Sequence, residues 1–155
     1  MSAIACWTSL HATAVVVGEQ GLIVRGPSGA GKSALALAML SLARERALFA
    51  ALIGDDRVFL RASAERLLLR GAPGFEGLIE RRFEGVVAVD HEASAVARLV
   101  VDLTGEDAAP PARMPEENER FTELLGVRLP RLTLAPSQGP LDRADTMLHI
   151  LARFR

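Results

Sequence analysis

Gly26-Pro27-Ser28-Gly29-Ala30-Gly31-Lys32-Ser33 fills every fixed position of the pattern G-x-x-x-x-G-K-[ST], the phosphate-binding P-loop. The apolar residues 21–25 before it predict a buried strand, and the strong helix formers at 34–40 after it predict a helix. A strand, a glycine-rich turn and a helix form the arrangement in which backbone N–H groups and a helix N-terminus bind phosphate. The stretch therefore predicts that residues 26–33 bind a nucleoside triphosphate.

Two side chains of this loop have expected roles. Lys32 should reach the β- and γ-phosphates, and the Ser33 hydroxyl should be a ligand of Mg²⁺. Lys32 is the only lysine among the 18 basic residues of the chain. A compact ammonium therefore stands where it suits phosphate oxygens better than a planar guanidinium. Without nucleotide, we expect this ammonium to face solvent.

Length and composition indicate a single domain spanning residues 1–155. At 155 residues and 50% hydrophobic composition, the chain can bury one core. A formal net charge of −1 argues against a nucleic-acid partner. The single cysteine, Cys6, excludes an internal disulfide and fits a reducing compartment. Without an apolar run of membrane-spanning length or a signal-peptide pattern, we expect a cytoplasmic protein with no membrane partner.

The remaining hydrophobic pattern predicts an α/β fold, in which a mixed sheet carries the P-loop between flanking helices. The β-branched residues 13–17 predict a strand that turns back into the strand before the loop, as its antiparallel partner. The buried helix after the loop should run from 32 to about 46, and a C-terminal helix at 141–155 should pack across the sheet. Further strands are expected at 48–53, 58–60, 65–69, 99–103 and 126–134.

Candidate functional residues follow from this topology. Antiparallel pairing places His11, at the start of one strand, on the same side of the sheet as the P-loop, at the end of the next. Asp55 and Asp56 follow an apolar strand, where an Mg²⁺-directed or base-acting aspartate would lie. Since adjacent residues of an extended segment point to opposite faces, at most one of the two can be aimed at a γ-phosphate. From the residues alone, a polar turn explains this pair equally well.

Two polar segments have less specific patterns. The charged residues at 77–85 are better explained, in isolation, as a surface loop. Residues 104–119 contain three prolines and five acidic residues, which predicts a long exposed loop. Loops of that length in compact domains are often functional.

Five motifs together carry a family resemblance. They are His11-Ala12-Thr13-Ala14, the P-loop, Asp55-Asp56 after an apolar strand, Gly77-Leu78-Ile79-Glu80-Arg81-Arg82, and Arg113-Met114-Pro115-Glu116. In this combination, from about Ala5 to the C-terminus, the chain resembles HPr kinase/phosphorylase. It is most similar to the short form, which consists of the C-terminal catalytic domain alone. The resemblance implies the P-loop-containing α/β fold of that domain.

The resemblance also implies an activity. It suggests an ATP-dependent protein-serine kinase that phosphorylates a small phosphocarrier protein (HPr) of the sugar phosphotransferase system, with ATP and Mg²⁺ bound. The family can reverse the reaction by phosphorolysis with inorganic phosphate, and it forms hexamers, so a homo-oligomer is expected. The implied roles are Asp56 as the base, Ser33 and Glu80 as Mg²⁺ ligands, Lys32 and Arg113 as stabilisers of the transferring phosphoryl group, and His11 beside the phosphate.

Three positions depart from the family pattern. Ala34 follows the P-loop serine where the family usually has an acidic residue, and Phe83 replaces a glycine. Residues 135–140 lack the arginine of a glycine-arginine element that the family ties to dephosphorylation. The first two changes weaken the expectation of efficient catalysis, and the third makes reverse phosphorolysis doubtful.

Two other functional classes remain open from the sequence. A small-molecule P-loop kinase should have an arginine-rich lid, but residues 104–119 contain only Arg113. A non-catalytic nucleotide-binding regulator would explain Ala34 and Phe83 as decay of an active site.

Overall fold

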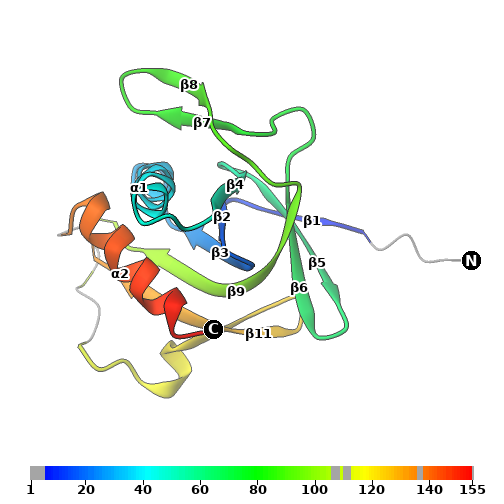
Figure 1. The fold of residues 1–155 in the computed structure, drawn as a ribbon. Helices are drawn as coiled ribbons and strands as arrows, with labels where there is room; N and C mark the ends of the chain where they lie inside the picture. Colours follow the sequence, from blue (N-terminus) through cyan, green and yellow to red (C-terminus); the bar gives the residue numbers. More distant parts are fainter. Residues whose placement is uncertain (1–5, 106–108, 110–112, 136–137, 155) are drawn as a thin grey trace, which may run out of the picture.

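The fold is described from a computed structural model, for residues 6–105, 109, 113–135 and 138–154. In this part of the chain, a nine-stranded mixed sheet and a separate two-stranded hairpin accompany two α-helices and one 3₁₀ turn (Figure 1). The helical elements are α1 (Lys32–Glu45), α2 (Pro140–Ala152) and the turn η1 (Glu117–Glu119). The strands are β1 (Thr8–Leu10), β2 (Thr13–Val17), β3 (Gln20–Arg25), β4 (Ala50–Gly54), β5 (Val58–Ser63), β6 (Arg66–Gly71), β7 (Leu78–Arg81), β8 (Gly85–Ala88), β9 (Ser94–Leu103), β10 (Phe121–Leu124) and β11 (Val127–Leu134). The predicted α/β fold with a mixed sheet is confirmed.

The sheet places the P-loop at its centre. Its strand order is β1-β5-β6-β9-β3-β2-β4, and β11, paired with β10, also pairs with β9. β3 is parallel to β9 and antiparallel to β2, with Thr13 opposite Val24. The predicted pairing of the strand after His11 with the strand before the P-loop is therefore confirmed.

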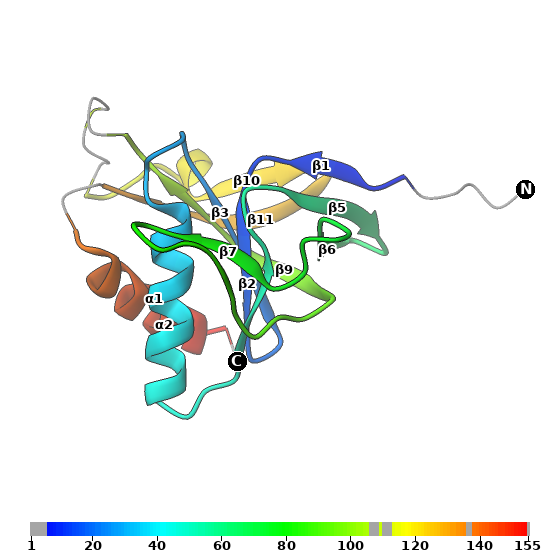
Figure 2. The same ribbon diagram turned by 90° about the horizontal axis from the view of Figure 1, so that it is seen from above.

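Two apolar clusters lie on opposite faces of the central strands. Alternate side chains, among them Val15, Leu22, Val24 and Val101, pack with α1 and α2 in one cluster. Their neighbours, among them Ala14, Val16, Ile23 and Val100, pack with β5 and β6 in the other. Central strands are thus buried on both faces, which explains their continuous hydrophobic runs. Figures 1 and 2 show both helices on one side of the curled sheet, as predicted for the C-terminal helix.

Several elements differ from the sequence prediction. Strands β1 and β10 were not expected, because they are short and each borders a single partner strand. Residues 78–88 form the β7–β8 hairpin rather than a loop, and Ile79 is buried in the core against α1. On α2, the hydrophobic Leu141 is 62% exposed, whereas the charged Arg143 is buried. No helix in the described residues has the length and hydropathy needed to cross a membrane.

One carboxylate joins three strands just before the P-loop. Asp102 on β9 accepts hydrogen bonds from Arg25 on β3, at 2.7 and 2.8 Å, and from Arg131 on β11, at 2.6 Å. Burial opposes ionisation of Asp102, but the two guanidinium groups outweigh it and hold the pKa of this carboxyl below its usual value. The network fixes the end of β3, from which the P-loop starts.

Replacing Asp102 should therefore destabilise the fold. We expect Asp102→Asn to lower the free energy of unfolding by about 1–3 kcal/mol at neutral pH, because charge-assisted hydrogen bonds are lost. Since the folded-state pKa is depressed, this contribution is present above the unfolded-state pKa of about 3.9 and disappears as the pH falls through the folded-state value. Urea denaturation across this pH range measures the difference.

The control is Asp90→Asn, whose ion pair with Arg44 is exposed at both side chains. Such a pair contributes about 0–1 kcal/mol. Equal stability losses in the two variants would contradict a special role for Asp102.

Candidate functional site

The P-loop connects β3 to α1 in a conformation that requires glycine. A Cβ at Gly26 would lie 2.8 Å from the backbone oxygen of Leu103 on the adjacent strand β9. Gly31, the N-cap of α1, has a φ of 98°, which L side chains rarely adopt. The loop therefore passes close to β9 and turns sharply into the helix, as its strand-loop-helix pattern predicts.

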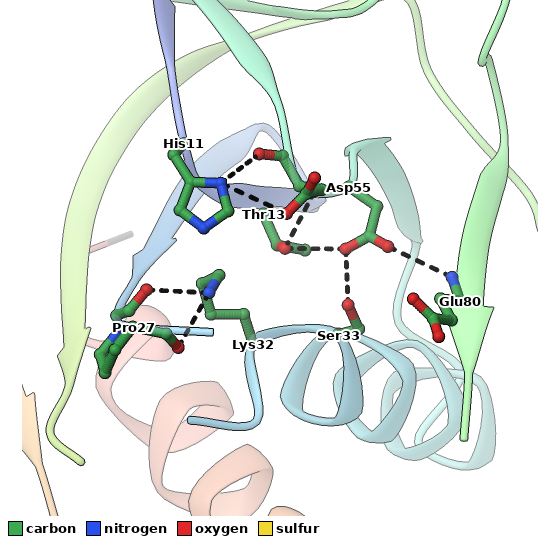
Figure 3. Close-up of polar contacts among 9 residues, drawn as sticks. His11, Thr13, Pro27, Lys32, Ser33, Asp55 and Glu80 are labelled. Atoms are coloured by element: carbon green, nitrogen blue, oxygen red, sulfur yellow. Dashed lines mark hydrogen bonds and ion pairs between the residues drawn. The ribbon is translucent and has the colours of Figure 1, made fainter. Parts of the chain in front are cut away.

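Lys32 is folded back onto the loop that precedes it. Its side chain is only 7% exposed, and Nζ donates hydrogen bonds to the backbone oxygens of Gly26, at 2.8 Å, and Pro27, at 3.2 Å (Figure 3). The expectation that its ammonium faces solvent in the absence of nucleotide is therefore wrong. The loop carbonyls replace water as hydrogen-bond acceptors for the ammonium group. The spacing of residues in the sequence does not reveal such backbone contacts.

Asp55 connects three elements at the N-terminus of α1. One carboxylate oxygen, Oδ1, accepts hydrogen bonds from Ser33 Oγ at 2.7 Å and Thr13 Oγ1 at 2.8 Å. The other, Oδ2, accepts from the backbone N–H of Glu80 at 3.2 Å. Figure 3 shows these contacts converging on Asp55 from β2, α1 and β7. The family resemblance implies a role for Asp56 and none for Asp55, although Asp55 is the aspartate in contact with the P-loop serine.

Asp56 lies beside His11, on the solvent side of Asp55. Its backbone has a positive φ of 65°, and its side chain is 79% exposed. His11 Nδ1 is 3.0 Å from the backbone oxygen of Asp56 and 3.3 Å from its Oδ1. Because both partners accept hydrogen bonds, Nδ1 carries the hydrogen in this arrangement. The two consecutive carboxylates therefore have different surroundings: one contacts the P-loop serine, and the other faces solvent.

Glu80 is close enough to this cluster to take part in it. Its backbone N–H contacts Asp55, and Figure 3 shows its carboxylate on the side of β7 that faces Ser33 and Asp55. Among the described residues, no three His, Cys, Asp or Glu side chains form a ready-made metal site. A metal here would therefore depend on Ser33 and on ligand oxygens, which fits Mg²⁺, an ion usually held by one or two carboxylates plus phosphates and water.

Arg113 is not joined to the cluster. It is exposed in the segment before η1, and no hydrogen bond or ion pair within the described part of the chain links it to His11, Lys32 or the aspartates. Its predicted place beside the transferring group stays a prediction.

Two hollows on the described part of the surface lie at opposite ends of the central strands. One, of about 720 Å³, lies between the P-loop residues 27–30, residues 104–105 after β9 and the start of α2. The other, of about 810 Å³, lies at the opposite end of the central strands, around the β2–β3 turn at Gly18 and Glu19. It contains none of the candidate site residues, so the chemistry described here belongs to the P-loop end.

Comparisons with known proteins agree on one family. No protein-family model matches the chain. Over 147 residues, 89% of this chain, it is 31% identical to HPr kinase/phosphorylase of Geobacillus thermodenitrificans, of which it covers 45%. Over 142 residues, 85% of the chain, it is 32% identical to HPr kinase/phosphorylase of Streptococcus salivarius, of which it covers 43%. The chain thus spans about half the length of the curated relatives it matches.

A solved structure shows the same fold. The Hpr(Ser) kinase/phosphatase from Coxiella burnetii superimposes with a TM-score of 0.72, over 96% of this chain and 99% of that one, at 21% sequence identity. At this identity the match concerns the fold alone. It confirms the predicted fold of a P-loop mixed sheet with flanking helices.

The contacts of Asp55 can be tested through Thr13, which is fully buried. Thr13→Val keeps the shape but removes the hydroxyl that donates to Asp55, so the free energy of unfolding should fall by about 0.5–1.5 kcal/mol in urea denaturation. The control is Thr122→Val on β10, where the described residues provide no side-chain hydrogen bond. If both variants were as stable as the parent, the hydrogen bond from Thr13 to Asp55 would contribute nothing.

Proposed function

Since this chain is a relative of the HPr kinase/phosphorylases, matched over about half of their length, we propose that it is an ATP-dependent protein-serine kinase. Its substrate would be a serine of a small HPr-like phosphocarrier protein of the sugar phosphotransferase system. Residues 1–155 would act as a single kinase domain, in the cytoplasm and as a homo-oligomer, for which the family suggests a hexamer. No nucleic-acid or membrane partner is part of this proposal.

The observation that carries the proposal is the difference in surroundings between two consecutive carboxylates. Asp55 is tied to the P-loop serine, while Asp56 is exposed beside His11, where the hydroxyl of an incoming protein could reach it. A nucleotide hydrolase needs no exposed acceptor site, whereas transfer to a protein serine does. This arrangement supports a kinase in which Asp56 accepts the serine proton as the hydroxyl oxygen bonds to the γ-phosphorus. The bond from the γ-phosphorus to the β–γ bridging oxygen breaks in the same transfer, and ADP leaves.

The residues around Ser33 fit Mg²⁺. The Ser33 hydroxyl and the Glu80 carboxylate supply hard oxygen ligands, and Asp55, hydrogen-bonded to Ser33, adds a second carboxylate next to them. Bound Mg²⁺ would neutralise charge on the phosphate oxygens. In this arrangement Asp55 orients the serine hydroxyl, a role that adds one residue to the predicted pair of Ser33 and Glu80.

The remaining residues would bind and neutralise the nucleotide. The loop from Gly26 to Ser33 would surround the phosphates with backbone N–H groups at the N-terminus of α1. Lys32 would exchange the carbonyls of Gly26 and Pro27 for β- and γ-phosphate oxygens. His11 would lie beside the phosphate, and Arg113 would have to approach from its exposed segment to stabilise the transferring group.

Transfer itself is the first test. Radiolabelled ATP should pass its γ-phosphate to an HPr-type carrier protein, and a carrier whose acceptor serine is replaced by alanine should remain unlabelled. ATP turnover with small molecules but not with the carrier would instead support a small-molecule kinase. Nucleotide binding without any turnover would support a regulator, in line with Ala34 and Phe83.

The base assignment predicts a specific loss. Asp56→Asn should reduce phosphoryl transfer at least about 100-fold, because the general base is removed. ATP affinity measured by calorimetry should change only a few-fold, since the exposed Asp56 does not contact the P-loop. If Asp56→Asn retains transfer while Asp55→Asn abolishes it, the base has been assigned to the wrong carboxylate.

The metal assignment predicts a changed Mg²⁺ requirement. Glu80→Gln should raise the Mg²⁺ concentration for half-maximal transfer several-fold, because an amide is a weaker ligand than a carboxylate. The fold should persist, since the contact of Glu80 with Asp55 is made by its backbone N–H. Glu84→Gln, in the turn of the same hairpin, is the matched control. Superimposable Mg²⁺ titrations of the two variants would leave Glu80 without a metal role.

A further inference from the structure

Arg143 is a buried cation that has no carboxylate partner among the residues that the structure describes. Its residue surface is only 4% exposed, although it projects from the first turns of α2. Its terminal nitrogens reach only backbone oxygens, with NH1 3.5 Å from Ala30 in the P-loop and NH2 2.5 Å from Ala135 after β11. Its Nε–H is buried with no hydrogen-bond partner, and no described carboxylate forms an ion pair with it. A buried charge in this state is uncommon unless something compensates it.

The surroundings of Arg143 add positive potential rather than reduce it. The side chain leaves α2 near its N-terminus, where the helix dipole disfavours cations. The P-loop beside it leads into the N-terminus of α1, and a Cβ at Gly31 would lie 3.6 Å from Arg143 NH1. Two helix N-termini and a guanidinium therefore converge, whereas the nearby Arg25 and Arg131 are neutralised in part by Asp102. Burial also lowers the pKa of Arg143, because the protein around its charge solvates it less well than water does.

Arg143 lines the hollow of about 720 Å³ on the outer side of the P-loop. The described lining consists of P-loop residues 27–30, Thr104 and Gly105 after β9, and Gln138 to Pro140 at the start of α2. Apart from Arg143, none of these side chains is charged, so no acid within this lining competes with an incoming anion. The hydroxyl of Ser28 and the amide of Gln138 are neutral donors suited to phosphate oxygens. The Thr104 hydroxyl donates instead to the backbone oxygen of Leu134, at 3.4 Å.

We propose that this hollow is a second phosphate-binding subsite, in which Arg143 and the N-terminus of α2 hold a phosphate group apart from the one at Lys32 and Ser33. The phosphate group has two possible sources: the nucleotide's own phosphate nearest the ribose, or a free phosphate ion. Only the first of these sources, the phosphate of a bound nucleotide, rests on the proposed function of the P-loop. A guanidinium suits this subsite because its planar donors match phosphate oxygens.

The first arm of the test measures free phosphate. The whole protein is saturated with pyrophosphate, which fills the P-loop, and is then titrated with inorganic phosphate by calorimetry and ³¹P NMR. We expect one further phosphate to bind, with an affinity at least tenfold weaker in Arg143→Gln and unchanged in Arg153→Gln. Arg153 is an exposed arginine at the opposite end of α2 and serves as the matched control.

The second arm measures the nucleotide. If the phosphate next to the ribose occupies the subsite, Arg143→Gln should weaken binding of a non-hydrolysable ATP analogue at least tenfold, with pyrophosphate affinity unchanged. Either arm, or both, supports the subsite and identifies its source. The proposal is overturned if Arg143→Gln leaves both the phosphate titration and the ratio of analogue to pyrophosphate affinity as in the parent.

Two measurements keep the test decisive. Arg143 also contacts Ala30 and Ala135, so circular dichroism melts accompany each variant. If Arg143→Gln does not fold, Arg143→Lys takes its place. Because an ammonium does not match phosphate oxygens as the planar donors of a guanidinium do, we expect Arg143→Lys to weaken binding at least about threefold in the arm that binds. If Arg143→Lys does not fold either, measurements on the parent protein decide. The proposal is overturned if the parent binds no second phosphate and binds the ATP analogue no more tightly than pyrophosphate. If pyrophosphate does not bind, the proposed function is contradicted instead. The subsite is then tested by titrating the unloaded protein with phosphate, and weaker binding in the Arg143 variant than in the parent supports it.

Discussion

The hydrogen bonds accepted by Asp55 hold the candidate site together. This single carboxylate receives the hydroxyl of Thr13 from the sheet, the hydroxyl of Ser33 from the P-loop helix and the backbone N–H of Glu80 from the β7–β8 hairpin. Since two of the donors are neutral hydroxyls, the carboxylate keeps its negative charge available at the N-terminus of α1. A cation and the anionic phosphates can therefore meet where the sheet, helix and hairpin already converge.

Positive charge near the P-loop is distributed unevenly, because some of the cations pair with a carboxylate and others contact backbone oxygens. Arg25 and Arg131 share the carboxylate of Asp102 and serve mainly to fix β3, β9 and β11. Within the described part of the chain, the hydrogen bonds of Lys32 and Arg143 go instead to backbone oxygens. Carbonyl dipoles hold a cation in place without cancelling its charge, so the field that attracts anions arises from these two side chains and the two helix N-termini.

Sequence patterns predicted those elements of the fold that depend on neighbouring residues in the chain. The P-loop, α1 and the β2–β3 pair follow from glycine spacing, helix propensity and β-branched runs, and the structure confirms them. The alternation argument assumed an extended segment, whereas Asp55 and Asp56 lie in a bend after β4. It could not tell which faces the P-loop serine, because that depends on the positive φ of Asp56 and on a hydroxyl 42 positions away. The burial of Lys32 and Arg143 could not be predicted either, since the hydrogen bonds that these two side chains make within the described residues go to backbone oxygens, which leave no trace in side-chain patterns.

The hairpin that carries Glu80 also depends on Asp55 for its position. Phe83, in its turn, has a φ of 72° that costs about 1–3 kcal/mol for a residue with a side chain, and at 96% exposure no burial offsets the cost. The guanidinium of Arg82 lies 5.2 Å from the centre of its ring. The hairpin is a separate two-stranded sheet, and such sheets are marginally stable alone. Its position therefore depends on Ile79 in the core and on the bond from Glu80 to Asp55, so the carboxylate that orients Ser33 also places the second predicted metal ligand.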